Sequence, residues 1–266
     1  MRLNKTGLSL FLLPVIISGL LLLLPGSATE VNMQERLMPP SWNHPMGTDF
    51  LGRDVAKRVA LGVFISLALS FMVVAITSLL GTALGSLSGM VGGVLDEVLM
   101  RAVDLLLAFP GFLLALTFVA LLGGGFWNLI LALSFSGWTS YCRLSRGIAI
   151  KLREEDFITS SLALGASYPW IFLHHTLPHV LPVIRVQATV SMAGVILAES
   201  SLSFLGLGLQ PPTPSLGGMI DAGRGFLLQA PWLSLFPGLF LFFMIMGLLM
   251  MAEEKKPRDL FFVKPS

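Results

Sequence analysis

Three of the four histidines in the chain lie in one short segment, which reads HHTLPH. Imidazole nitrogens are common metal ligands, so this cluster raises the question of a metal site. His174 and His175 are adjacent and would point about 100 degrees apart on a helix, whereas His175 and His179 would share a face. The single cysteine, Cys142, supplies none of the spacings of a structural zinc site. We therefore predict no metal site and interpret the histidines as contacts within the protein or with a partner protein.

One acidic residue, Glu199, lies inside a long apolar stretch that reads VILAESSLSF. A carboxylate in an apolar environment is costly unless it faces a partner group or water. Two roles stay open for Glu199. It is either a group on a substrate pathway or a structural carboxylate bonded to a neighbouring helix or a partner chain, and we favour the second. No paired acids and no nucleophile–base pair occur at a similar depth, so we predict no catalytic residues.

The segment HPMGTDFLGRDV, residues 44–55, combines glycines with closely spaced opposite charges. Glycine and the His-Pro pair favour turns, and neighbouring charges can hold a folded backbone together. We interpret this segment as a structural turn rather than a direct substrate contact. The predicted members of the turn are Gly47, Asp49, Gly52, Arg53 and Asp54.

The composition indicates where these residues must lie. The chain has 266 residues, of which 55% are hydrophobic and only 12% are charged, and its mean hydropathy is +0.83. Soluble domains carry about 25% charged residues, so this chain could not cover a water-facing surface. It is therefore predicted to be an all-α polytopic membrane protein. Its net charge of +2 is too small to suggest a nucleic-acid partner.

Apolar segments of about twenty residues predict transmembrane helices, because a helix satisfies its own backbone within lipid. The predicted spans number about six and cover 8–24, 59–90, 98–122, 127–150, 181–205 and 232–251. The chain would then divide into an N-terminal span with an outer loop, a transmembrane domain that contains a cytoplasmic loop, and a cytoplasmic tail. These parts cover 1–58, 59–252 with the loop at about 151–180, and 253–266.

The distribution of Lys and Arg orients these spans. If both termini are cytoplasmic, twelve of the 17 basic residues lie on the cytoplasmic side, as the positive-inside rule favours. The first span has a second interpretation. Its basic start, apolar core and the sequence GSATE resemble a secretory signal peptide, whose removal would leave five spans. We expect the span to be retained.

Charged residues near the cytoplasmic ends of the spans have simple expected roles. Arg101 and Asp104 are three residues apart and predict a local ion pair. Asp96 is expected to lie in solvent, together with the following Glu97. Arg143 and Arg146 are expected to extend to lipid headgroups or to the cytoplasmic loop.

The cytoplasmic loop contains the sequence DFITSSLALGASYPWIFLHHTLP, residues 156–178. Residues 156–164 are compatible with a helix that Gly165 ends, and Pro169 suits the first turn of a second helix. We predict two short helices with an apolar ridge across the cytoplasmic mouth of the bundle. Such a ridge needs a groove in another protein, or the membrane surface, to bury it.

This loop resembles the coupling loop of ABC importer permeases. The family pattern is Glu-Ala-Ala, three residues, Gly, nine residues, Ile, one residue, Leu-Pro. Gly165, Leu177 and Pro178 match this pattern, whereas His175 stands at the Ile position and Thr-Ser-Ser, ending at Ser161, replaces Glu-Ala-Ala. The segments HPMGTDFLGRDV, LSFLGLGLQPPTPSLGGMI and APWLSLFPGL look like signatures of the dipeptide, oligopeptide and nickel permeases.

The resemblance implies the type I ABC importer permease fold in a bacterial inner membrane. It implies three kinds of partner besides membrane lipid: a second homologous permease, two ABC ATPase subunits and an extracytoplasmic substrate-binding protein. The chain contains no Gly-x-x-x-x-Gly-Lys-Ser/Thr phosphate loop. We therefore expect no cofactor of its own and no enzymatic activity, with ATP bound and hydrolysed by the partner subunits.

The resemblance also assigns a site and a substrate class. The residues expected to couple to the ATPase are Phe157, Ser160, Ser161, Leu162, Gly165, Ala166, Trp170, His175, Leu177 and Pro178. Within the ridge, Leu164 joins Phe157, Leu162 and Trp170 as a residue expected to bury against the ATPase. The expected substrate is a di- or oligopeptide, with nickel or a nickel chelate as the alternative. A secondary transporter and an ABC exporter subunit are less favoured.

Overall fold

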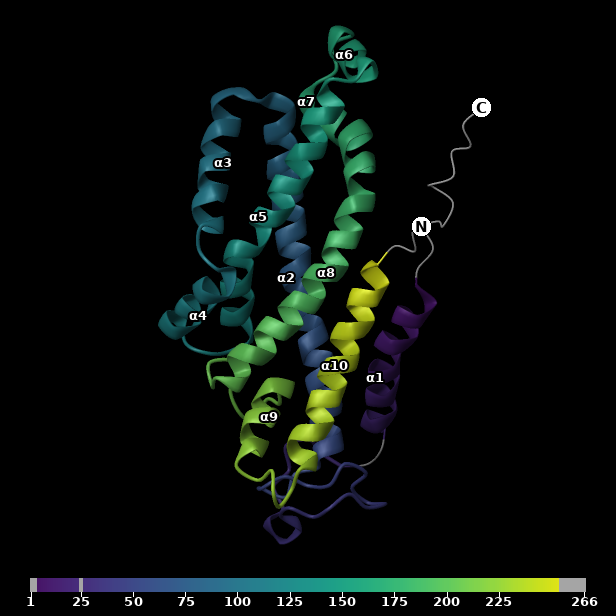
Figure 1. Ribbon diagram of the computed structural model, residues 1–266, viewed down its shortest axis with the longest axis vertical. Helices are drawn as coiled ribbons and strands as arrows, with labels where there is room; N and C mark the ends of the chain where they lie inside the picture. The colour runs from purple at the N-terminus through teal and green to yellow at the C-terminus, as the bar shows by residue number, and fades with distance from the viewer. Residues whose placement is uncertain (1–3, 24–25, 254–266) are drawn as a thin grey trace, which may run out of the picture.

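A computed structural model of the chain describes residues 4–23 and 26–253. Within these residues the fold is helical, and one isolated β-bridge joins Thr48 and Asp54. The prediction of an all-α protein is confirmed (Figure 1). The elements are α1 Lys5–Leu23, the 3-10 turn η1 Met33–Glu35, α2 Val55–Val91, α3 Gly93–Leu107, α4 Gly111–Leu122, α5 Phe126–Arg153, α6 Asp156–Ala163, α7 Tyr168–Ile171, the π-helical turn η2 Phe172–Thr176, α8 Leu177–Phe204, α9 Leu216–Arg224 and α10 Trp232–Ala252.

The central helix, α2, runs nearly the whole height of the molecule (Figure 1). Its 37 residues correspond to about 55 Å of helix. It packs closely against α5 because glycines line the contact. A Cβ atom on Gly81 would lie 2.3 Å from the carbonyl oxygen of Trp138, and one on Gly85 would lie 2.0 Å from that of Cys142. These two helices therefore form the rigid axis of the fold.

The helices at the two ends of the described chain, α1 and α10, pack against each other side by side (Figure 1). A Cβ atom on Gly7 would meet the backbone nitrogen of Met251 at 2.6 Å, and one on Gly247 would meet that of Phe11 at 2.4 Å. The start of α1 therefore lies beside the end of α10, and both helices approach the same side of the bundle.

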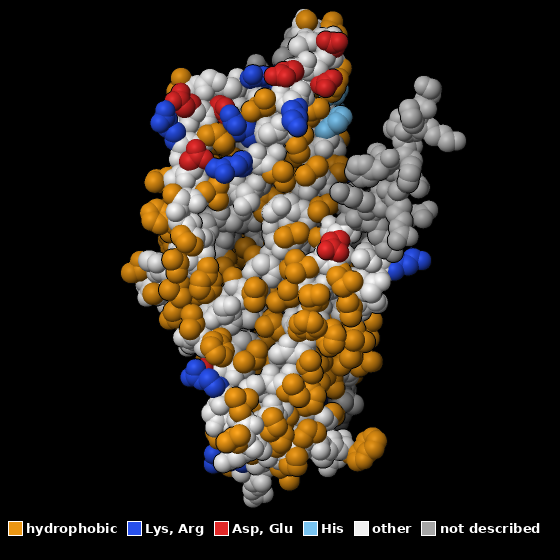
Figure 2. Space-filling model, viewed as in Figure 1, with side chains coloured by type: hydrophobic (Ala, Val, Ile, Leu, Met, Phe, Trp, Pro, Cys, Tyr) orange, Lys and Arg blue, Asp and Glu red, His pale blue; other side chains and the backbone are white. Residues whose placement is uncertain are grey.

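The two ends of the molecule differ in structure. The loop before α2 and the short helix α9 lie at one end, whereas α6 and α7 project at the other (Figure 1). Charged side chains gather over α3, α5 and α6 near the second end, and apolar side chains cover much of the middle (Figure 2). This distribution is that of a protein whose middle lies in lipid.

The helices agree in place with the predicted spans, but their number is not settled. Among the described residues, α1, α2, α8 with its preceding turns, and α10 are long and apolar enough to cross a membrane. The predicted third span is instead a bent pair, α3 and α4, which meet at 81° around Pro110. The pair would make a fifth span. The α5 helix is not among the helices that qualify by composition, and its second half carries Arg143, Arg146, Lys151 and Arg153.

Asp96 does not lie free in solvent, contrary to the prediction. Its carboxylate binds the guanidinium group of Arg146 on α5 through contacts of 2.5 and 2.6 Å, and it accepts a hydrogen bond from the hydroxyl of Ser88. Arg146 is thereby held between helices instead of extending to lipid or to the loop. The neighbouring Glu97 is exposed, as expected.

The predicted ion pair between Arg101 and Asp104 is also wrong. Arg101 pairs with Glu97 one helical turn earlier, at 2.5 Å. Asp104 instead binds Arg143 on α5. The side chain of Asp104 faces α5, so Asp104 pairs with Arg143 on that helix and not with Arg101 on its own helix. Together with Asp96–Arg146, this pair ties α3 to α5.

Candidate functional site

The first candidate site is the projecting segment that begins with α6. Its opening residue is Asp156, an acid in the first turn, where the helix dipole favours negative charge. The helix ends before Gly165, whose φ of +88° is a conformation that glycine adopts without strain. The amide of Ala166 donates to the carbonyl oxygen of Ser161 at 3.0 Å and closes the end of the helix. The predicted first helix and its glycine stop are both present.

The second predicted short helix is not separate. The α7 helix passes through the π-helical turn and continues into α8, so residues Pro169–Phe204 form one 36-residue helical segment. Pro178 has no amide hydrogen, and it lies just after the π-helical turn, where the regular α-helical pattern of backbone hydrogen bonds is already interrupted. The π-helical turn, Phe172–Thr176, interrupts the α-helical pattern for one turn. Single π-helical turns of this kind are frequent at functional sites. The residues of α7 therefore belong to the same helical segment as α8.

The segment has a buried and an exposed side. Ile158 and Ile171 are fully buried and pack with Met90 and Ala149, which anchors the segment on the ends of α2 and α5. On the other side, several large apolar side chains face outward. Their exposed fractions are 40% for Phe157, 45% for Trp170 and 89% for Leu164. The structure therefore exposes apolar side chains on this segment, as the prediction of an apolar ridge requires.

The histidines belong to this ring cluster. The ring of Phe157 lies 5.6 Å from that of His175 and 6.1 Å from that of His179, and Trp170 stacks on His174 at 4.5 Å. The Nδ1 atom of His179 lies 2.6 Å from the carbonyl oxygen of His175. Within the described residues no three His, Cys, Asp or Glu side chains come together in a way that could hold a metal ion. The geometry makes the histidines packing partners of the aromatic ridge.

The remaining predicted coupling residues frame the ridge. Ser160 is exposed, and the hydroxyl of Ser161 donates to the carbonyl oxygen of Phe157 at 2.7 Å. Leu177 is half-buried and Pro178 is exposed. The side chain of Leu162 lies outside what the structure describes. The predicted coupling residues therefore belong to one continuous segment at one end of the bundle.

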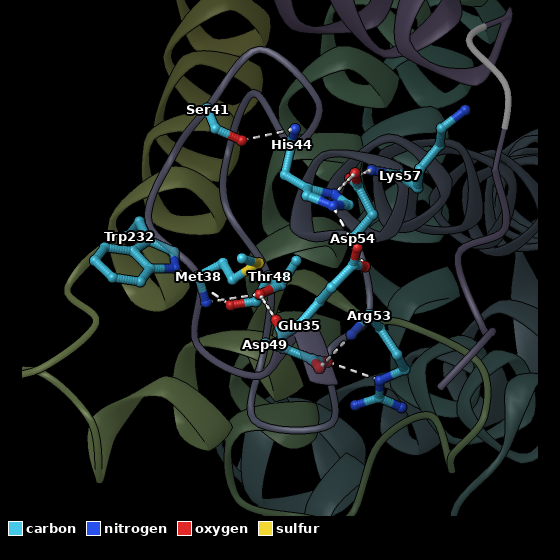
Figure 3. A network of polar contacts seen from close by, with 10 residues as sticks. All are labelled: Glu35, Met38, Ser41, His44, Thr48, Asp49, Arg53, Asp54, Lys57 and Trp232. Atoms are coloured by element: carbon cyan, nitrogen blue, oxygen red, sulfur yellow. Dashed lines mark hydrogen bonds and ion pairs between the residues drawn. The ribbon is translucent and has the colours of Figure 1, made fainter. Parts of the chain in front are cut away.

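The second candidate site is the turn at the opposite end (Figure 3). Asp49 is its centre. Its Oδ1 atom accepts hydrogen bonds from the amides of Leu51 at 2.8 Å and Arg53 at 2.9 Å. Its Oδ2 atom accepts from Nε of Arg53 at 2.7 Å and lies 3.6 Å from Nε of Arg58. One buried carboxylate therefore closes the turn and neutralises part of the charge of two arginines.

Asp54 joins this turn to the start of α2 (Figure 3). It is the N-cap residue of α2, and its Oδ1 atom accepts from the amide of Lys57 at 3.0 Å. Its other oxygen lies 2.8 Å from Nδ1 of His44, whose Nε2 is 3.5 Å from Glu35. The imidazole thus bridges two acids from different parts of the loop before α2. His44 begins the motif HPMGTDFLGRDV, but its position in that motif did not predict that it would lie between Asp54 and Glu35.

Glycine is required at two positions of the turn. Gly47 has a φ of +74°, and a Cβ there would lie 2.7 Å from Nε1 of Trp232. Gly52 has a φ of +71°, and a Cβ there would collide with the carbonyl oxygen of Asn32 at 1.7 Å. The indole of Trp232 also donates to the carbonyl oxygen of Thr48 at 3.3 Å. The five predicted turn residues are therefore brought together, and α10 contributes a partner that local sequence could not reveal.

A cavity of about 270 Å³ lies between this turn and α9. Arg53, Arg58, Gln210 and Asp221 supply much of its polar lining. Sequence reasoning missed the last three as site residues, because they come from α2, the loop after α8 and α9, and share no motif. The cavity places charged groups of both signs at the end of the bundle opposite α6.

Glu199 lies between these two ends and is fully buried. Its carboxylate accepts hydrogen bonds from Ser203 at 2.8 Å, from Ser66 on α2 at 3.0 Å and from Ser200 at 3.3 Å. The carboxylate therefore links α8 to α2. This geometry is that of an interhelical carboxylate, the favoured of the two roles, and the choice between them stays a prediction.

Comparisons with known proteins agree with this arrangement. Residues 81–252 match the family described as binding-protein-dependent transport system inner membrane component. The chain is 38% identical to the dipeptide transport system permease protein DppC of Alkalihalophilus pseudofirmus, over 95% of this chain and 85% of that protein. It is 36% identical to DppC of Haemophilus influenzae, over 93% and 86% of the two chains. It is 41% identical to the glutathione transport system permease protein GsiD of Shigella dysenteriae, over 80% and 71%.

Proposed function

The chain belongs to the family of binding-protein-dependent transport system inner membrane components, and from this premise we propose that it is the permease subunit of an ATP-driven peptide importer. It is a multi-pass protein of the inner membrane and not an enzyme. The observation that carries the proposal is the match to peptide permeases over nearly the whole chain, from the outer turn through the segment that contains α6.

The substrate follows from the relatives. Two of them are named as dipeptide permeases and one as a glutathione permease, and glutathione is itself a short peptide. We therefore assign di- and oligopeptides as the transported class. Nickel, the alternative, has no comparable support among these relatives.

The projecting segment supports an ATPase partner. Phe157 on α6, Leu164 just after α6, and Trp170 on α7 expose apolar surface, and α7 runs on into α8. An exposed apolar ridge of this kind fits a groove in another protein. We infer that two ATPase subunits supply the energy, one of which receives this ridge, and that their closure moves α8.

The orientation completes the proposal. The charged end near α6 would face the cytoplasm, as would the start of α1 and the end of α10. The turn around Asp49 and the cavity beside α9 would then face outward, where a substrate-binding protein docks. A second, homologous permease would cover the other side of the pathway.

The test is purification of the assembled complex followed by transport in liposomes. We expect the chain to co-purify with a second permease and with ATPase subunits, and the complex to take up a labelled dipeptide or glutathione only with ATP and binding protein. Uptake of nickel in place of peptide would support the alternative. Transport by this chain alone, driven by an ion gradient, would overturn the proposal in favour of a secondary transporter.

A further inference from the structure

Two hollows meet along the facing sides of α5 and α8. The first, about 320 Å³, lies between α2, the start of α4, α5 and α8. The second, about 660 Å³, continues along α5 and α8 toward the end that carries α6. Ser140 lines both hollows, so the two adjoin at this residue, and together they are called the depression below.

Apolar side chains make up most of the lining of this depression, but the lining also contains several hydroxyl groups. Hydroxyl groups of Thr77, Ser136, Ser140, Tyr141 and Ser191 border the first hollow. A hydroxyl can both donate and accept a hydrogen bond. Five of the α5 residues that line the hollows are spaced three or four positions apart. Residues at this spacing share one face of a helix. The five residues are Ser136, Ser140, Arg143, Gly147 and Lys151.

The facing side of α8 repeats this pattern. Gln187, Ser191, Gly194 and Ala198 line the hollows at intervals of three or four residues. The amide of Gln187 lies 3.4 Å from the hydroxyl of Ser191, which places two polar groups side by side on this face. Small and polar residues therefore face each other across the depression from two helices.

Several of these groups lack a partner. Within the described residues, the hydroxyls of Ser136 and Ser140 make no hydrogen bond. The hydroxyl of Tyr141, a side chain that is 1% exposed, faces Ser191 but forms no hydrogen bond of good geometry. Ser140 is exposed, yet it lies roughly 20 Å along α5 from the outer end of the helix. Lipid cannot hydrogen-bond such a group, so this face meets water, a ligand or another protein.

We propose that this hydroxyl-lined depression is the chain's share of the translocation path and that it receives the backbone of an extended peptide. The inference rests on the proposed function. A peptide backbone alternates donors and acceptors, and hydroxyls can pair with either. Such a lining contacts the backbone without selecting side chains, which suits a pathway for peptides of varied sequence. Lys151, near the α6 end, would attract the terminal carboxylate.

The test uses single cysteines in the assembled, reconstituted complex. Cys142 is the only cysteine in the chain, so Cys142→Ala gives a cysteine-free parent. Into it are placed Ser140→Cys and Ser191→Cys, each in a separate variant. Leu131→Cys, on an exposed apolar position of α5 outside both hollows, is the matched control. Each variant is treated with a charged, water-soluble thiosulfonate, and labelling and peptide uptake are both measured.

We expect Ser140→Cys and Ser191→Cys to be labelled, labelling to slow in the presence of peptide, and uptake to fall at least tenfold afterwards. Leu131→Cys should remain unlabelled with uptake unchanged. The proposal is wrong if neither Ser140→Cys nor Ser191→Cys is labelled. It is also wrong if both variants keep full peptide uptake after complete labelling. If both variants are labelled but the untreated parent complex transports no peptide, the depression is water-accessible and the proposed peptide transport is wrong.

Discussion

The carboxylate of Asp49 holds Arg53 twice, through the backbone amide at 2.9 Å and through the guanidinium Nε at 2.7 Å. Both residues are buried, and the same carboxylate lies 3.6 Å from Arg58. The ion pair thus fixes the backbone of the turn before α2 and also balances charge beside the cavity that this turn and α9 line.

Asp49→Asn is expected to destabilise the complex. The substitution removes the charge from a buried pair and leaves two arginines beside a neutral amide, at a cost of roughly 3–5 kcal/mol if the pair behaves like other broken buried pairs. The measurement is the thermal unfolding midpoint of the complex in detergent. Glu30→Gln, an exposed acid of the same loop, is the control and should leave the midpoint unchanged. An unshifted midpoint for Asp49→Asn would show that the turn does not depend on this charge.

Polar substitution of the ridge should separate ATP hydrolysis from transport. Phe157→Ser and Trp170→Ser remove exposed apolar side chains that have no large share in the chain's own core, so the permease should still fold and insert. We expect uptake to fall more than tenfold, while the ATPase subunits keep or raise their basal hydrolysis. The assay measures both rates in the same liposomes. Leu95→Ser, an exposed apolar residue of α3 near the same end, is the control. Normal coupling in both ridge variants would rule out this docking surface.

The sequence predicted the ridge and the turn because both are local. Gly165 stops a helix through its own backbone, and Asp49, Arg53 and Asp54 meet within one motif. The long apolar runs also predicted an all-α membrane protein, although not the number of its spans. Such features depend on neighbours a few residues away, which is the range that sequence patterns describe.

The interhelical contacts could not be predicted in this way. Ser66 donates to Glu199 across 133 residues of sequence, and Asp96 meets Arg146 across 50. The position of each partner depends on the rotation and depth of separate helices, which packing determines. The bend at Pro110 and the continuity of α7 with α8 are further cases, because proline marks a possible break but does not fix the angle.

Glu199 offers a direct choice between its two roles. In Glu199→Gln the amide oxygen can still accept from one of the two hydroxyls of Ser66 and Ser203, and the amide NH2 can donate to the other hydroxyl, so an interhelical role predicts normal assembly and near-normal uptake. Glu199→Leu removes the acceptor and leaves buried hydroxyls unpaired, at a cost of roughly 1–3 kcal/mol. We expect only the leucine variant to lower complex yield and thermal stability. Intact assembly with lost uptake in Glu199→Gln would favour the pathway role instead.

The contact between α1 and α10 predicts that the first span is retained and needed. Gly7 and Gly247 each face the backbone of the other helix, with room for no side chain, whereas Gly19 on α1 faces open space. Gly7→Leu and Gly247→Leu should push the helices apart and reduce the yield of assembled complex severalfold, because such close packing cannot relax cheaply. Gly19→Leu is the matched control on the same helix and should assemble normally. The mature N-terminus, determined by mass spectrometry of the purified complex, should precede α1. A mature chain that begins near Thr29, or equal assembly of all three variants, would show that α1 is not a permanent part of the bundle.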